Sequence, residues 1–191
     1  MNHSPYPVVL DACVLYPAML RSLLMWLGKS GLYQPKWTAI IHDEWQRNLV
    51  ENRPELTREQ LKRIEDKMND TLPDALVTGF EKLIPGLPLP DPDDRHVVAA
   101  AIRCDAEVIV TINMKDFPKE NLAEFDIEAM HPDEFISDLF DLNQALVLNA
   151  VKQTRANLKK PPVNVEQFLA SLLKSGLPMT VKTLERYKFM I

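Results

Sequence analysis

Cysteine is scarce in this sequence. The 191 residues include two, Cys13 and Cys104, which are too few for a disulfide framework and do not have the spacing of a metal site. The four histidines show no metal-binding pairing either. We therefore expect both thiols to be reduced and buried, without a chemical role, and any bound metal to be held by oxygen atoms.

Long apolar runs and targeting signals are also missing. No segment approaches the ~18 uninterrupted apolar residues of a membrane span, and residues 1–5 lack the basic-then-apolar pattern of a signal peptide. With 46% hydrophobic and 26% charged residues, the composition is that of a soluble globular protein. We expect a cytoplasmic protein that has one sizeable core and no membrane contacts.

Charge is unevenly distributed along the chain. The net charge of −5 divides into −11 for residues 1–143 and +6 for residues 144–191, where there are eight Lys or Arg residues and two Glu residues. We therefore predict a domain over residues 1–143 and a basic helical extension over residues 144–191. The extension is predicted to contain helices from Gln144 to Lys159 and from Val165 to Ser175, and a short third helix after Thr180.

Residues 1–143 alternate between short apolar runs and amphipathic segments. Strands are predicted at residues 8–10, 107–111 and 127–130. Helices with recognisable start or stop signals are predicted at residues 17–30, 39–51, 58–72, 94–102 and 132–142. Prolines between residues 73 and 92 exclude one long element there. This order predicts an α/β fold whose parallel sheet is covered by helices on both faces.

Four acidic residues follow or flank these elements: Asp11, Glu44, Asp94 and Asp116. Ligands of an open parallel sheet bind at the carboxyl ends of its strands, which is where these residues are expected. Carboxylates without cysteine or paired histidine favour hard cations such as Mg²⁺ or Mn²⁺. One or two such ions activate a water for attack on a phosphodiester, so the pattern predicts a metal-dependent nuclease.

Neighbouring residues leave some of these assignments open. Asp93 is expected to cap the helix that follows it, which would leave Asp94 for the metal, although the two could exchange roles. Asp43 competes with Glu44, and Asp91 is predicted to be a turn residue before a proline.

Two histidines and three tryptophans are predicted to have ordinary structural roles. His42 and His96 neighbour site acids, and a surface or helix-dipole position is favoured for both over contact with a phosphate. The tryptophans, at positions 26, 37 and 45, are too scattered for a base-stacking platform and are expected in the core or an interface.

Taken in order, the motifs around residues 8–15 (Val-Val-Leu-Asp-Ala-Cys-Val-Leu), 42–45 (His-Asp-Glu-Trp), 93–101 (Asp-Asp-Arg-His-Val-Val-Ala-Ala-Ala) and 111–118 (Thr-Ile-Asn-Met-Lys-Asp-Phe-Pro) resemble those of the PIN-domain nucleases. The likeness is strongest to the VapC-like toxins of type II toxin–antitoxin pairs, and it covers about residues 6–142.

The resemblance implies a three-layer PIN-like α/β domain with the activity of a Mg²⁺- or Mn²⁺-dependent endoribonuclease. It implies that the metal-binding and catalytic acids are Asp11, Glu44 and Asp94, and that the fourth corner of the site is formed by Thr111, Asn113 and Asp116. It also implies an RNA substrate, a cognate antitoxin as protein partner, and a homodimer. The basic extension lies outside the region of resemblance.

The fourth corner departs from the family pattern. Many relatives have Asp directly after a Thr-Asn pair, whereas this chain reads Thr111-Ile112-Asn113 and its nearest acid is Asp116. Asn113 could orient a water or a metal ligand, and Asp116 could bind the metal through water or cap the loop. Both possibilities stay open at this point.

Other classes of protein compete with the nuclease. A phosphatase of the haloacid-dehalogenase type needs a second Asp where Cys13 stands, and the Asp and Lys of a response-regulator receiver have no counterpart here. A non-catalytic PIN-like interaction module with an incomplete metal site remains the main alternative.

The basic extension offers one further prediction. Lys152, Arg155 and Lys159 share a helical face, and Lys160 follows it. Phosphate contacts of this kind supply most non-specific affinity for nucleic acid, so we predict that the face lies near the mouth of the site and guides RNA. The competing explanation is that it neutralises the acidic domain or receives an antitoxin.

Overall fold

The computed structural model describes residues 5–159 and 161–191, so Lys160 of the predicted basic face lies outside it. Its centre is an all-parallel four-stranded sheet with the order β2-β1-β3-β4. The strands are β1 (Pro7–Leu10), β2 (Gln34–Lys36), β3 (Val108–Val110) and β4 (Glu128–Met130). The predicted α/β class and parallel sheet are confirmed.

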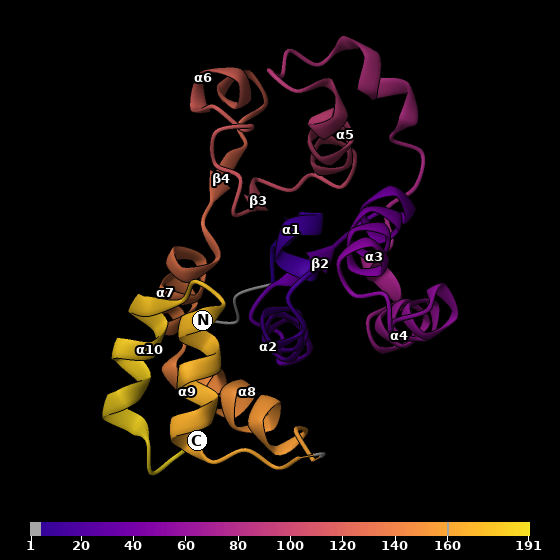
Figure 1. The fold of residues 1–191 in the computed structure, drawn as a ribbon. Coiled ribbons are helices and arrows are strands. Elements are labelled where there is room, and N and C mark those ends of the chain that lie inside the picture. The colour runs from indigo at the N-terminus through magenta and orange to yellow at the C-terminus, as the bar shows by residue number, and fades with distance from the viewer. Residues whose placement is uncertain (1–4, 160) are drawn as a thin grey trace.

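Helices cover both faces of the sheet because its central strands are apolar on both sides. Val8, Val9 and Leu10 of β1 are completely buried, which an alternating strand with one wet face would not allow. Figure 1 shows α5 (Arg95–Arg103) on one side of the sheet and α2 (Ala18–Lys29) on the other. The protein therefore has the three predicted layers.

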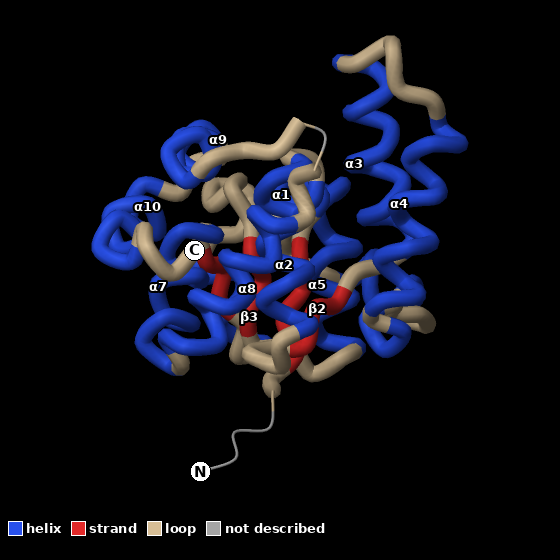
Figure 2. The backbone as a smooth tube through the Cα atoms, turned by 90° about the horizontal axis from the view of Figure 1, so that it is seen from below, coloured by secondary structure: helices blue, strands red, loops and turns tan. Residues whose placement is uncertain are grey.

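Three further helices of the first 143 residues start where they were predicted: α3 (Ala39–Asn52), α4 (Arg58–Thr71) and α7 (Pro132–Leu142). The short helices α1 (Ala12–Leu15) and α6 (Lys119–Leu122) were not predicted. Thr38 caps α3 by accepting a hydrogen bond from Ile41 N at 3.1 Å, and Thr57 forms the predicted capping box with Gln60. Figure 2 shows α3 and α4 as an adjacent pair that projects beyond the strands.

Strand β2 was not predicted from the sequence. It holds a proline, Pro35, which is tolerated because β2 is the edge strand beside β1. Gly28 of α2 lies against it so closely that a Cβ atom there would be 2.2 Å from Pro35 Cγ. A glycine is therefore required at this helix–strand contact.

The proline-rich segment before α5 forms three short 3₁₀ helices, η1 (Pro73–Ala75), η2 (Glu81–Gly86) and η3 (Pro92–Asp94). The prediction that Asp93 is the cap is wrong. No side chain of the described residues caps α5, and Asp91 instead caps η3, because its Oδ1 accepts a hydrogen bond from Asp93 N at 2.9 Å and proline at the next position fixes this turn. Asp94 stands at the start of α5 without capping it.

The C-terminal helical extension is confirmed, and it packs on α2 and α7. It comprises α8 (Gln144–Ala156), α9 (Val165–Lys174), α10 (Pro178–Leu184) and the 3₁₀ turn η5 (Glu185–Tyr187). Another 3₁₀ turn, η4 (Ala123–Phe125), precedes the extension and follows α6. The third helix begins at Pro178, before Thr180, because proline suits a first helical turn. The buried Asp133 of α7 accepts hydrogen bonds from Met179 N and Thr180 N at 2.7 and 2.8 Å.

The structure differs in two respects from the prediction of a basic face on α8 at the mouth of the site. Arg155 donates from Nη1 to Val163 O and from Nη2 to Ile191 O, both at 3.1 Å, so it ties the extension together. In Figure 1, α8 lies beyond α2, away from α1 and α5, which flank the predicted site. Lys152 and Lys159 remain exposed.

The part of the chain that the structure describes contains no helix that could span a membrane. None of its helices combines the length and the apolar character that a bilayer crossing requires.

Candidate metal centre

Asp11 lies where β1 ends and α1 begins, next to the end of β3. Its backbone N–H donates to Val110 O at 3.1 Å. The side chain is 4% exposed. Its Oδ1 accepts from Ala12 N at 2.6 Å, and its Oδ2 accepts from Thr111 Oγ1 at 2.7 Å and from Cys13 Sγ at 3.0 Å. The parallel pairing of β1 with β3 therefore fixes this carboxylate from both strands.

The pKa of Asp11 reflects its burial. Desolvation, the largest cause, raises the pKa of this carboxyl above its ordinary value. The three hydrogen bonds act in the opposite direction, and the negative charge of Glu44 adds to the rise. The hydrogen bonds from the protein do not fully offset the cost of burying the charged carboxylate. A nearby cation would stabilise this charged form.

Cys13 is a site residue that sequence reasoning missed. Its sulfur lies 3.3 Å from Thr111 Oγ1 and accepts a hydrogen bond from Ile112 N at 3.1 Å, in addition to donating to Asp11. Burial, followed by the charge of Asp11, raises the pKa of this thiol to about 12, so it is a neutral donor. The expectation that Cys13 has no part in the site is wrong, because the close approach of the two strands is not visible in the sequence.

Asp94 lies among like charges. Its pKa is raised to about 7, first by burial and then by the charges of its acidic neighbours Asp11, Asp116, Asp91 and Glu44. Its side chain accepts no hydrogen bond from any described residue. The other three predicted acids therefore all lie within electrostatic reach of Asp94.

Glu44 projects from α3 toward the same region. Its Oε1 lies 3.0 Å from Nε2 of His96, a residue of α5 whose side chain is 6% exposed, against 23% for Glu44. Asp43, the competing acid, turns outward to Arg47 and Arg58 at 3.4 and 3.0 Å. The structure thus places Glu44 in the cluster and Asp43 on the surface.

Neither histidine has the predicted surface or helix-dipole role. His96 is buried against Glu44, and His42 is buried in the core, where its Nδ1 accepts from Trp45 Nε1 at 3.0 Å. Trp37 and Trp45 are completely buried, as expected for core aromatics. The contact of His96 with Glu44 has no signal in the sequence beyond the position of His96 two residues after Asp94.

The fourth corner is a tight turn after β3. Thr111 is completely buried and its Oγ1 accepts from Asn113 N at 3.0 Å. Asp116 N donates to Asn113 O at 3.0 Å. The Asn113 side chain is exposed, whereas Asp116 is half-buried and its charge acts on Asp94.

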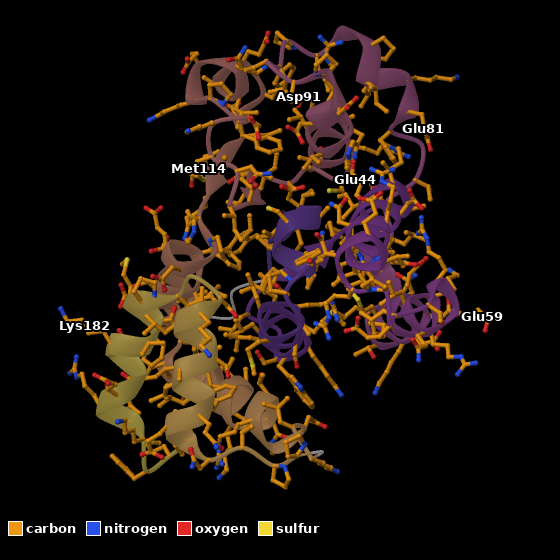
Figure 3. The ribbon with its side chains drawn as sticks, in the orientation of Figure 1. Glu44, Glu59, Glu81, Asp91, Met114 and Lys182 are labelled. Carbon is orange, nitrogen blue, oxygen red and sulfur yellow. The ribbon has the colours of Figure 1, made fainter. Side chains whose placement is uncertain are left out.

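The cluster suits a hard cation in its chemistry. All four acids offer oxygen, and among residues 5–159 and 161–191 no Lys or Arg forms an ion pair with Asp11, Asp94 or Asp116. Within the same residues, no three acidic, His or Cys side chains stand close enough to form a ready ligand set. In Figure 3, Glu44 and Met114 lie to either side of α1, whereas Lys182 of α10 is well away from them.

A three-layer α/β domain with an acidic cluster at the carboxyl edge of a parallel sheet is thus the class that fold and site define. The PIN domain family matches residues 7–115, over half of the chain, and the chain belongs to that family. A second family, the VapC50 C-terminal domain, matches residues 132–186. This match covers α7 and most of the helical extension.

One curated relative is similar over part of the chain. It is the protein named "Putative ribonuclease VapC50" of Mycobacterium tuberculosis (strain ATCC 25618 / H37Rv), which is 50% identical over 62 residues. The aligned stretch spans 30% of this chain and 37% of the relative. No solved structure matches the chain.

Proposed function

We propose that this protein is a Mg²⁺- or Mn²⁺-dependent endoribonuclease that cleaves phosphodiester bonds in RNA, and that it is the toxin of a toxin–antitoxin pair. The observation that carries the proposal is the cluster of four carboxylates at the carboxyl edge of the sheet, with which no Lys or Arg of the described residues forms an ion pair. Membership of the PIN family and the printed name of the relative support the activity and the choice of RNA.

Asp11, Glu44, Asp94 and Asp116 would hold the cation in this proposal. When bound, a divalent ion activates a water and neutralises the charge that develops on the phosphate during in-line attack. Asp11 is the pre-organised member, since Ala12, Cys13 and Thr111 fix both of its oxygens. Thr111 also orders the turn that carries Asn113, which is proposed to orient a water.

Partners and organisation follow from the same proposal. A ribonuclease that acts as a toxin has to be inhibited in its own cell, and we propose that a cognate antitoxin binds it. We also propose that the protein forms a homodimer and is located in the cytoplasm. Residues 1–143 would form the nuclease domain and residues 144–191 a separate basic extension. With Arg155 engaged in backbone contacts, the extension's exposed lysines are available for a partner.

RNA cleavage by the full chain tests the function. We expect cleavage with Mg²⁺ or Mn²⁺, none with EDTA, and background levels for Asp11→Asn and Asp94→Asn, which keep the side-chain shape but remove the charge that binds the ion. A non-catalytic PIN-like module predicts no metal-dependent cleavage and no rise in melting temperature with Mn²⁺. Full activity of Asp11→Asn would reject the site.

A further inference from the structure

Building on the proposed function, we infer that His96 is a positioning residue that holds the Glu44 carboxylate in the metal centre. Glu44 belongs to α3 and His96 to α5, two helices that come from distant parts of the chain. The 3.0 Å contact between Nε2 and Oε1 is the hydrogen bond that joins them at the site.

The contact is asymmetric in burial, and this decides which residue positions the other. The His96 side chain is 6% exposed and belongs to the buried residues of α5, whereas the Glu44 side chain is 23% exposed. Glutamate has several rotatable bonds and, on an open helix face, samples many rotamers. The buried imidazole is therefore the fixed member, and the carboxylate is the member that it orients.

The hydrogen bonds of the imidazole ring also indicate that His96 orients Glu44. His96 Nδ1 is buried and has no partner among the described residues, so Nε2 carries the one polar contact of the ring. The tautomer assigned from this network has its hydrogen on Nε2, which donates to Glu44. Within the described part of the chain, the only polar contact of this buried imidazole is with Glu44. This arrangement is explained if the function of His96 is to fix the orientation of the Glu44 carboxylate.

His96 also lies two residues after Asp94 on the same chain segment. The start of α5 thus supplies one acid directly and, through His96, fixes a second acid that α3 supplies. Hydrogen bonds to metal-binding groups commonly change metal affinity by about 10–100-fold when they are removed. The inference is that His96 couples the two helices into one metal centre.

Mn²⁺ binding to the RNA-free full chain, followed through the paramagnetic resonance of the free ion, tests this role. His96→Leu removes the hydrogen bond and should weaken Mn²⁺ binding by about tenfold. His96→Gln should restore most of the affinity, because the Gln amide nitrogen is as many bonds from Cα as Nε2. His96→Asn, whose amide is one bond shorter and matches Nδ1, should not.

Two controls separate positioning from loss of packing. His42→Leu removes another buried imidazole that contacts none of the four acids, and it should lower the urea midpoint while leaving Mn²⁺ affinity unchanged. In a Glu44→Gln background, His96→Leu should have no further effect on Mn²⁺ affinity, since its action passes through Glu44.

The outcomes distinguish this inference from the proposed function. If the unaltered chain binds no Mn²⁺, the metal centre fails and the role of His96 fails with it. If the unaltered chain binds Mn²⁺ and His96→Leu binds it equally well, the positioning role alone is overturned. The positioning role is also overturned if His42→Leu loses as much Mn²⁺ affinity as His96→Leu. It is likewise overturned if His96→Leu lowers Mn²⁺ affinity as strongly in the Glu44→Gln background as in the unaltered chain.

Discussion

Thr111 donates a hydrogen bond from its hydroxyl to Oδ2 of Asp11 at 2.7 Å, across the ends of the adjacent strands β3 and β1. Both side chains are almost completely buried. This contact lets a charged oxygen be held in the interior of the protein, because it replaces part of the hydration that the carboxylate loses.

Replacing Thr111 by Val should therefore destabilise the protein. The change keeps the shape but leaves a buried carboxylate without one donor and Asn113 N without its acceptor, at a cost of about 1–3 kcal/mol. Thr111→Ser retains the hydroxyl and is the matched control. Urea denaturation checks the difference, and equal midpoints for the Val and Ser variants would contradict it.

The raised pKa of Asp94, about 7, predicts the pH dependence of stability in EDTA. In the unfolded chain this carboxyl has a pKa of ~3.9, so the folded state binds the proton more tightly. Its contribution to stability is complete below the unfolded pKa and is lost as the pH rises through about 7.

The urea midpoint should accordingly fall as the pH rises from the unfolded pKa of ~3.9 to the folded pKa of about 7, and level off above it. Asp94→Asn should flatten the fall, and so should Mn²⁺, because a cation favours the charged carboxylate. Identical pH profiles for the unaltered protein and Asp94→Asn would show that the acids do not interact as described.

The two candidates at the fourth corner should differ in their kinetic effects. Asp116 contributes charge to the cluster, so Asp116→Ala should raise the Mg²⁺ concentration needed for cleavage. Asn113 is exposed and uncharged, so Asn113→Ala should lower the rate at saturating Mg²⁺ instead. Negligible effects of both changes would leave a site of three acids.

The basic residues of α8 should separate into a structural and a surface group. Arg155→Gln removes two bonds to backbone carbonyls and should lower the melting temperature. Lys152→Gln combined with Lys159→Gln should leave it unchanged, since both side chains are exposed. An antitoxin-binding role predicts weaker partner binding by this double variant, and an RNA role predicts a flatter salt dependence of RNA binding. No change in either measurement would exclude both roles.

Much of the fold is determined by local sequence. The short apolar run Val8 to Leu10, ended by the polar Asp11, favours a buried strand. Thr57 with Gln60 specifies a helix start through bonds within one turn. Such signals need no distant partner, so they are legible in the chain itself. Strand β2 was missed for the opposite reason, because Pro35 is acceptable only where the sheet leaves an edge.

The sequence by itself determined the longer helices, three of the four strands and the acids that a hard cation would need, since periodicity, caps and residue chemistry are local properties. Tertiary structure alone decided that Cys13 lies against Thr111, that His96 faces Glu44, and that Arg155 is engaged by Val163 and Ile191. These side chains are polar groups whose roles depend on what burial brings beside them. Desolvation makes each such group require a partner, and the identity of that partner is set by the packing of distant segments.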